Sequence, residues 1–328
     1  MSNASDASAS PDVMQLLTLA CALLGIAFAS ILLVIAETEL SPYAATFDRL
    51  SIATVVFAGW WISQRLVRQR LAQIGTGEDS APLDTFVLGL ILLSGLAFSS
   101  SLSIWAWSLT QTSVANSTLL NNMMPIFTTL GAWALFKEHF SQRFLWGIAI
   151  AIAGVIIIGV EDLQMTGGLL GDGAALLAAM LSAVNILCVQ QLRKRFDAVW
   201  IMMWTSLIGS GVLLTIIWLR QEPIFPSTAT GWGAVISLAA LSQVLGQGLL
   251  TYCLKALSAS FVSVSMLAIP VLAAVLAVVL FDETLSLLNW LAFAVVLCGI
   301  YVSVSAQAQQ DTVPLNKAMA LQGEKGDF

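Results

Sequence analysis

Long hydrophobic runs, separated by short polar segments, make up most of this chain. We predict ten membrane-spanning helices, at residues 13–36, 43–64, 84–108, 112–135, 141–160, 170–190, 198–219, 230–254, 259–281 and 286–305. Many of these runs exceed the roughly 18 residues that distinguish a spanning helix from a buried core helix. Transmembrane β-strands would alternate apolar and polar residues instead, so the pattern predicts an all-α integral membrane protein.

The two halves of the chain share a residue pattern. Four residues recur 145 positions later, and the pairs are Pro125 and Pro270, Phe136 and Phe281, Glu138 and Glu283, and Gly154 and Gly299. Each copy, 13–160 and 161–305, holds five predicted spans. Because five is odd, the second copy must be inverted in the bilayer, as in many secondary transporters. Polar tails at 1–12 and 306–328 flank the two repeats and are predicted to be disordered.

Basic residues between the predicted spans are concentrated on one side of the membrane. With the N-terminus inside, eleven fall on the inner side: Arg65, Arg68, Arg70, Lys137, Arg143, Arg193, Lys194, Arg195, Lys255, Lys317 and Lys325. Only Arg220 falls on the outer side. Cytoplasmic loops are enriched in Lys and Arg, so we predict that both termini are cytoplasmic. The same rule explains why Lys137, predicted inside, has Asp282 as its predicted outer counterpart.

The overall composition supports a membrane protein and narrows its partners. Hydrophobic residues make up 58% of the chain, charged residues 10%, and the mean hydropathy is +0.89. No ordinary water-soluble domain of this length has such values. The net charge of −6 comes from few ionisable groups and indicates no acidic or basic partner. We therefore predict a multi-pass protein of the lipid bilayer that does not bind nucleic acid.

The sequence contains no recognisable catalytic or metal-binding motif. Its four cysteines lie in apolar runs without metal-ligand spacing, at Cys21, Cys188, Cys253 and Cys298. It has neither a Ser/His/Asp set nor a phosphate-binding loop, which excludes ATP as a direct energy source. We predict no enzyme activity, no metal and no cofactor.

Polar side chains within the predicted spans are candidates for a functional site. They are costly in lipid, so they tend to face the protein interior or a watery cavity. The candidate amides are Asn116, Asn121, Asn185, Gln243 and Gln247. The two glutamines are one helical turn apart and should share a face. The alternative is hydrogen bonding between helices, which contributes about 0.6–2 kcal/mol per bond.

Two aromatic residues and a serine are further candidates near the ends of the third and eighth spans. Ser103 and Trp107 share one helix face, and the repeat pairs Trp107 with Tyr252. The aromatic rings could stack on substrate or close a gate. Alternatively, they belong to the aromatic belt at the membrane interface.

Each repeat has one proline near the middle of a predicted span, Pro125 in the fourth and Pro270 in the ninth. Proline removes a backbone hydrogen bond from the helix. Broken helices in transporters bind substrate or allow bending. The equivalent positions favour a hinge role, with a plain kink as the alternative.

Asp48 and Arg49 are adjacent charged residues inside the second predicted span. An aspartate there could bind a coupling proton. Neighbouring helix positions point about 100° apart, so the two side chains need not pair with each other. The alternative is an interfacial or structural ion pair whose side chains reach toward the membrane surface.

The chain resembles the drug/metabolite transporter superfamily, and within it the EamA-type ten-helix exporters, over residues 13–305. In the first repeat the similar stretches are Thr112-Ser113-Val114-Ala115, Asn122-Met123-Met124-Pro125, Phe136-Lys137-Glu138, Gly147 and Gly154, with Arg49 in the second span. In the second repeat they are Ala256-Leu257-Ser258-Ala259, Ile269-Pro270-Val271, Asp282-Glu283 and Gly299-Ile300-Tyr301.

This resemblance implies alternating access through a central cavity lined by spans one, three, four, six, eight and nine, with spans five and ten as scaffold. It also implies efflux of small metabolites, often amino acids, across the bacterial inner membrane. Nearly all candidate contacts are neutral, which favours a zwitterion or a neutral solute over a phosphate. An importer, an obligatory exchanger, and a non-transporting membrane sensor or assembly protein are the alternatives.

Overall fold

The computed structural model describes residues 13–72, 84–112, 114–160, 168–281 and 286–323, and these form helices without any strand. Seven segments are long and apolar enough to cross a membrane: Val13–Ala36, Pro42–Val67, Thr85–Ser108, Leu169–Arg193, Ala198–Arg220, Ala229–Cys253 and Ala259–Leu280. Shorter apolar helices cover Gln142–Ile157 and Trp290–Ala306. The predicted all-α membrane fold is confirmed.

Each of the ten predicted spans corresponds to one or more helices of the described chain. The first three are α1 (Val13–Ala36), α2 (Pro42–Ala72) and α3 (Thr85–Ser108). The fourth to seventh are α4 (Val114–Asn121) with α5 (Met124–Phe136), α6 (Gln142–Val160), α7 (Leu169–Arg193) and α8 (Ala198–Arg220). The last three are α9 (Ala229–Ser237) with η1 (Leu238–Gln247) and α10 (Gly248–Cys253), α11 (Ala259–Ser265) with α12 (Ala268–Phe281), and α13 (Leu287–Gly323).

The last helix is longer than the tenth predicted span. The sequence predicts a disordered tail from residue 306, whereas α13 continues as a helix to Gly323. Ala, Gln and Leu are frequent in this stretch and favour helix, whereas Pro314 in its interior opposes it. The predicted N-terminal tail, 1–12, lies outside the described residues.

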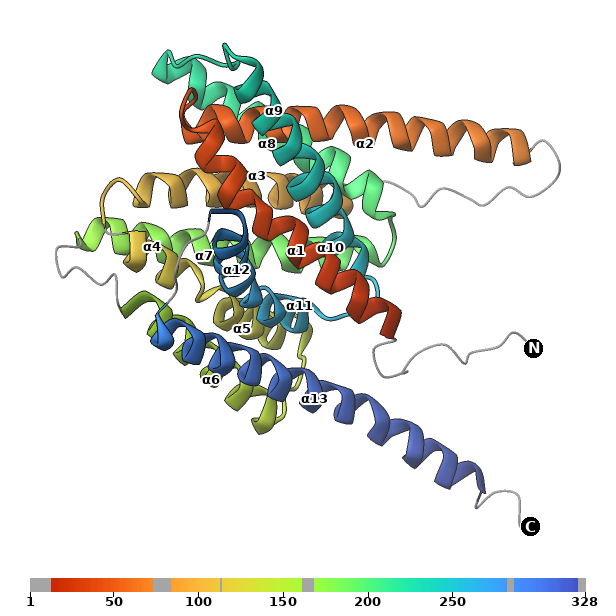
Figure 1. Cartoon of the computed structure of the whole chain (residues 1–328). Helices are drawn as coiled ribbons and strands as arrows, with labels where there is room; N and C mark the ends of the chain where they lie inside the picture. Colours follow the sequence, from red (N-terminus) through yellow and green to blue (C-terminus); the bar gives the residue numbers. More distant parts are fainter. Residues whose placement is uncertain (1–12, 73–83, 113, 161–167, 282–285, 324–328) are drawn as a thin grey trace.

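Helix packing follows the two-fold relation expected for inverted repeats (Figure 1). Helix α1 packs against η1 and α12, and its equivalent in the second repeat, α7, packs against their equivalents α3 and α5. Helix α2 packs against its own equivalent, α8. The repeats therefore interlock as partners related by inverted symmetry.

Helices α6 and α13, the fifth and tenth spans, form a close pair through small residues. A Cβ atom added at Gly147 would lie 2.6 Å from the Ser303 nitrogen, and one at Gly299 would lie 2.3 Å from the Ala151 nitrogen. Only glycine permits this approach of two backbones, a common device between membrane helices.

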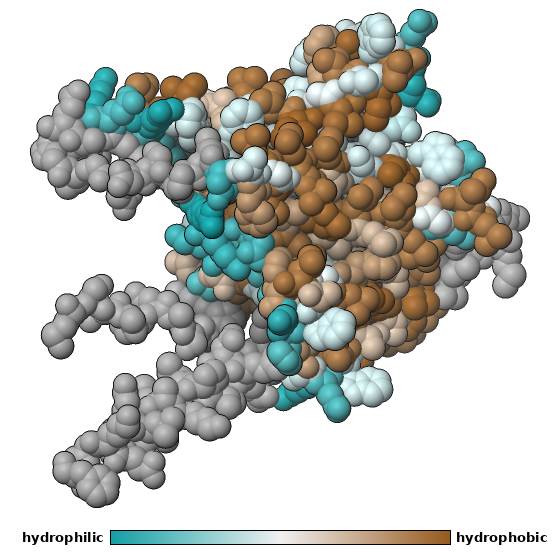
Figure 2. Space-filling view, turned by 180° about the vertical axis from the view of Figure 1, so that it is seen from behind, coloured by the Kyte–Doolittle hydropathy of each residue, from teal (hydrophilic) through white to brown (hydrophobic). Residues whose placement is uncertain are grey.

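The outer surface of the bundle suits a lipid environment. Exposed side chains on it include Val55, Leu130 and Trp218. Figure 2 shows a broad hydrophobic surface in the middle of one face, with hydrophilic residues toward its margins. A contiguous apolar surface of this size on a water-soluble protein would be exceptional.

The fourth and ninth spans are both interrupted just before their prolines. Helix α4 ends at Asn121 and α5 begins at Met124, so Pro125 lies in the first turn of α5. Helix α11 ends at Ser265 and α12 begins at Ala268, two residues before Pro270. Proline fits the first turn of a helix because its missing N–H has no partner there.

The eighth span contains a ten-residue π-helix, η1, which the sequence pattern does not predict. Such wide turns are rare and often mark functional sites. Helix α1 crosses η1 at a pair of glycines. A Cβ at Gly25 would lie 2.8 Å from the Leu241 oxygen, and one at Gly246 would lie 2.9 Å from the Ile26 nitrogen. The two backbones therefore touch at the centre of the bundle.

Candidate functional site

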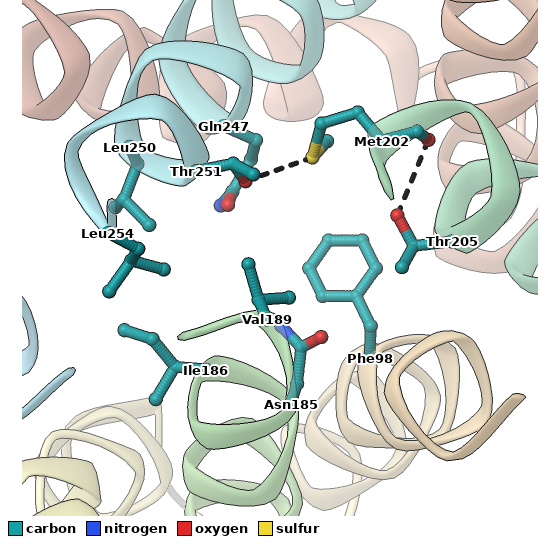
Figure 3. Close-up of a pocket in the computed structure, with 10 residues that line it drawn as sticks. All are labelled: Phe98, Asn185, Ile186, Val189, Met202, Thr205, Gln247, Leu250, Thr251 and Leu254. Carbon is teal, nitrogen blue, oxygen red and sulfur yellow. Dashed lines mark hydrogen bonds between the residues drawn. The ribbon is translucent and has the colours of Figure 1, made fainter. Parts of the chain in front are cut away.

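A small cavity, partly open to solvent, lies between α3, α7, α8 and the η1–α10 segment (Figure 3). It is lined by Phe98, Asn185, Ile186, Val189, Met202, Thr205, Gln247, Leu250, Thr251 and Leu254. Helix α3 belongs to the first repeat and the other three elements to the second. The cavity therefore lies where the two repeats meet.

Two amide side chains face into this cavity and remain available for a ligand. The Ser94 hydroxyl donates to the Asn185 Oδ1 over 2.8 Å, which holds the amide in place and leaves its nitrogen free to donate. No described residue hydrogen-bonds to the Gln247 side chain. Figure 3 shows the two amides facing the space between α7 and η1.

The hydroxyl groups in the cavity wall are already occupied. Thr205 donates to the Ile201 carbonyl of its own helix over 2.9 Å, and Thr251 donates to the Met202 sulfur over 3.1 Å. The remaining lining is apolar and contains no charged side chain. Such a wall, with a few placed polar groups, is typical of small-molecule sites. Among the described residues, no group of His, Cys, Asp and Glu could hold a metal ion.

Asn185 and Gln247 are the predicted site residues that the structure brings together. Two others of the polar set lie elsewhere. Asn121, at the end of α4, is partly buried, and its Oδ1 has no partner. Ser103 donates to the Ser99 carbonyl of its own helix over 2.8 Å. Asn116 lies in α4, but its side chain is outside the described part of the structure.

The two predicted aromatic residues do not line the cavity. Trp107 is 41% exposed and Tyr252 is 58% exposed. The Tyr252 ring lies 5.8 Å from the guanidinium carbon of Arg193. Their exposure fits the alternative of an interfacial position better than stacking on a ligand in this cavity.

Gln243 is fully buried but takes part in a different contact. Arg49 donates through Nε to the Gln243 Oε1 over 2.9 Å, and the Gln243 amide nitrogen lies 3.5 Å from the Ser206 hydroxyl. This chain of contacts, which we call the polar joint, connects α2 of the first repeat with η1 and α8 of the second. Gln243 thus contacts Arg49 and Gln247 lines the cavity, although the sequence predicted that the two glutamines share one helix face.

Asp48 is 2% exposed and Arg49 is 8% exposed, so neither side chain reaches the membrane surface. The described residues contain no ion pair between them, and the Asp48 Oδ2 has no hydrogen-bond partner. The expected alternative of an interfacial ion pair is therefore wrong. An ionisable side chain buried inside a membrane span is costly, and such residues are candidates for function.

The structure adds cavity residues that sequence reasoning missed. Met202 and Thr205 come from α8, the seventh span, which the resemblance did not place at a cavity. Thr205 and Thr251 are polar residues within predicted spans and could have been found by the criterion applied to the amides. The apolar Phe98 carries no comparable signal.

Comparison with known proteins identifies relatives along nearly the whole chain. The profile of the EamA-like transporter family matches residues 13–160 and 169–305. An uncharacterized transporter of Synechocystis sp. is 24% identical over 286 residues, which cover 82% of each chain. An uncharacterized transporter of Archaeoglobus fulgidus is 22% identical and covers 83% of this chain and 90% of its own. Human solute carrier family 35 member G1 is 24% identical over 142 residues, 39% of each chain.

A solved crystal structure also resembles this protein. It superposes with a TM-score of 0.74 and 16% sequence identity, covering 90% of this chain and 98% of that chain. At this identity, the likeness concerns the fold alone, and it supports the arrangement of helices described above.

Proposed function

Because the chain belongs to the EamA-like transporter family, and so is a multi-pass membrane transporter, we propose that it exports small neutral or zwitterionic metabolites, such as amino acids. In this proposal it works in the bacterial inner membrane as a secondary transporter, by alternating access of a site between its two repeats. Relatives that are named as transporters over most of the chain support a role in transport rather than catalysis.

The observation that carries the substrate class is the pair of amides in an uncharged cavity. Asn185 and Gln247 offer both donors and acceptors, which can bind the ammonium and carboxylate groups of a zwitterion. The apolar wall around them, including Phe98 and Leu250, suits a hydrocarbon side chain. A phosphorylated substrate would need a cationic partner, and the cavity lining has none.

In the proposed cycle, the two repeats rock about their common interface. The paired breaks before Pro125 and Pro270 would let the fourth and ninth spans bend as hinges. The polar joint from Arg49 through Gln243 to Ser206 crosses the same interface. The distances within the polar joint depend on the relative orientation of the two repeats. The joint would therefore stabilise one conformation over another.

Protons are the proposed coupling ion, with Asp48 as the carrier. The carboxyl is buried at the interface with α8, next to the only charged member of the polar joint. Release of a proton from Asp48 would leave a buried carboxylate. Water can solvate this carboxylate in a more open conformation, which release would therefore favour. Proton binding and the conformational change would thereby be linked.

The experiment that tests this function is a toxicity screen in cells that overproduce the protein. We expect protection against one class of amino acids or neutral analogues. Asn185→Ala and Gln247→Ala should each weaken the apparent affinity about fivefold, the effect of losing one hydrogen bond. Both variants should reach the membrane at normal levels.

Thr215→Val serves as the matched control, because Thr215 is exposed and its hydroxyl bonds to the Gly211 carbonyl of its own helix. Protection should be unchanged in this variant. If Asn185→Ala and Gln247→Ala protect cells as well as the parent, the cavity is not the substrate site. Greater sensitivity of the overproducing cells, in place of protection, would favour an importer.

A further inference from the structure

Two polar contacts outside the cavity join the repeats at opposite ends of the bundle. At one end, Glu39 in the α1–α2 turn accepts hydrogen bonds from the Ser227 nitrogen and hydroxyl, both over 3.0 Å. It also accepts bonds from the nitrogen and hydroxyl of Thr228, the N-cap of α9. We call this the outer clasp.

At the other end, Arg195 in the α7–α8 turn pairs with Asp84, the N-cap of α3. The Arg195 Nη1 lies 3.1 Å from the Asp84 Oδ2, and both side chains are about half exposed. We call this the inner clasp. The α1–α2 turn follows the first span, and the start of α3 follows the second. Because each span crosses the bilayer once, the two clasps lie on opposite sides (Figure 1).

The two clasps occupy equivalent positions in the two repeats. Helices α2 and α8 begin 156 positions apart, at Pro42 and Ala198, and the same distance separates Glu39 from Arg195. Asp84 and Thr228 are the N-caps of α3 and α9, which begin the third span of each repeat. The inverted symmetry therefore converts one clasp into the other.

The charges of the clasps are reversed, and the N-cap residue explains why. Thr228 is neutral, so the free N–H groups at the start of α9 attract an acid from the other repeat. Asp84 already supplies the acid at the start of α3, so its partner must be a base. The basic partner is on the predicted cytoplasmic side, in agreement with the distribution of basic loop residues.

A glycine makes room for the outer clasp. A Cβ atom at Gly231, in the first turn of α9, would lie 2.8 Å from the Glu39 Oε1. Glycine at this position lets the carboxylate reach the end of the helix. The space for Glu39 is therefore built into α9.

We propose that the outer and inner clasps are the gates of the transport cycle. Each must break for the cavity to open toward its own side, while the other remains formed. This inference rests on the proposed alternating-access function. Both clasps are formed in this structure.

The test measures access to the cavity from each side of the membrane, and it requires no known substrate. Thr205→Cys places a thiol in the cavity wall of the full-length chain, with the four native cysteines replaced by alanine. Labelling with a membrane-impermeant thiol reagent is compared in spheroplasts, which expose the outer side, and in inverted vesicles, which expose the inner side.

Glu39→Gln should raise labelling from outside about tenfold and lower it from inside, since it removes charge-assisted hydrogen bonds. Arg195→Gln and Asp84→Asn should do the reverse, by about twofold to fivefold, because an exposed ion pair is weaker. Asp84→Asn keeps the N-cap and should preserve the fold. Gly231→Ala should act in the same direction as Glu39→Gln.

Thr215→Val is the matched control, because Thr215 is exposed and its hydroxyl bonds only to the Gly211 carbonyl of its own helix. It should leave both labelling rates unchanged.

The proposal is overturned if variants of the two clasps change labelling on the same side, or change neither side. That outcome differs from a failure of alternating access itself. If the parent protein were labelled rapidly from both sides at once, the proposed function would be wrong, whatever the clasp variants did.

Discussion

At the scale of single residues, the buried polar joint distinguishes this bundle from a purely apolar one. Arg49 carries a full charge at 8% exposure, and Gln243 supplies an acceptor for it. A charged donor that loses its acceptor in such surroundings keeps its whole desolvation cost. Loss of the Gln243 side chain should therefore lower the free energy of unfolding by more than the loss of one ordinary hydrogen bond.

Gln243→Leu is expected to lower the free energy of unfolding by about 2–4 kcal/mol, because it leaves the Arg49 guanidinium without this acceptor. Denaturant or thermal unfolding of the purified protein in detergent measures the change. Ser206→Ala is the control, since its 3.5 Å contact is long, and should cost less than about 1 kcal/mol. Equal stability of the two variants would show that the joint does not stabilise the fold.

The clasps should respond to acid. Hydrogen bonds from Thr228 and Ser227 lower the pKa of Glu39 below its ordinary value of 4.5, and the Val87 N–H and Arg195 lower the pKa of Asp84 below 3.8. A lowered pKa means that each contact is complete above the ordinary value and is lost as the pH falls through the lowered one.

Both clasps should therefore hold at neutral pH and open only in strong acid. Hydrogen–deuterium exchange at the Ser227 and Thr228 amides, corrected for intrinsic rates, should speed up below about pH 4, the ordinary carboxyl range. In Glu39→Gln the exchange should be fast already at pH 7. Acid-insensitive protection in the parent would contradict the role of the Glu39 charge.

Residue roles were only partly predictable from the sequence. The cost of amides in lipid correctly indicated that Asn185 and Gln247 point inward. The same cost could not distinguish these two residues from Gln243. A glutamine that binds a buried charged partner and a glutamine that lines a cavity give the same sequence pattern. Trp107 and Tyr252 lie on exposed faces, and a span that is apolar all round does not reveal which face is exposed.

At the scale of helices, the crossing of α1 and η1 fixes the centre of the bundle. Gly246→Ala should destabilise the protein by about 1–3 kcal/mol, since the added methyl meets the backbone nitrogen of Ile26 as well as its side chain. Gly233→Ala, in the preceding turns of the same span, meets nothing within 4 Å and is the control.

Unfolding of both glycine variants in detergent provides the comparison. The control should be as stable as the parent or slightly more so, because alanine favours helix. If the two variants lost equal stability, the glycines would be required for the backbone conformation of the eighth span. The close contact with α1 would then not be the reason for Gly246.

The helices themselves were largely predictable, and their irregularities were predictable only where a residue type causes them. The breaks in the fourth and ninth spans follow from Pro125 and Pro270. No residue type in the eighth span signals the π-helix. It is accompanied by the packing of Gly246 against Gly25, and a contact between residues so far apart in the sequence could not be predicted. The extension of α13 past the tenth predicted span contains Pro314 and has no hydrophobic pattern that would predict it.

At the scale of the whole molecule, the inverted repeat explains most of the architecture. The 145-residue displacement and the odd number of spans predicted it, and the matched helix pairs of the structure agree. We expect function where the symmetry is broken. Asn185 and Gln247 belong to the second repeat, and the two clasps carry opposite charges at equivalent positions.

The central claim is that the two repeats form a secondary transporter for small neutral or zwitterionic metabolites. The most direct measurement is uptake of radiolabelled amino acids by proteoliposomes that contain only the purified protein, with an imposed proton gradient. We predict accumulation above the external concentration, its loss when the gradient is collapsed, and a strong reduction in Gln247→Ala. If no amino acid or other neutral solute moved under any imposed gradient, the account would be contradicted.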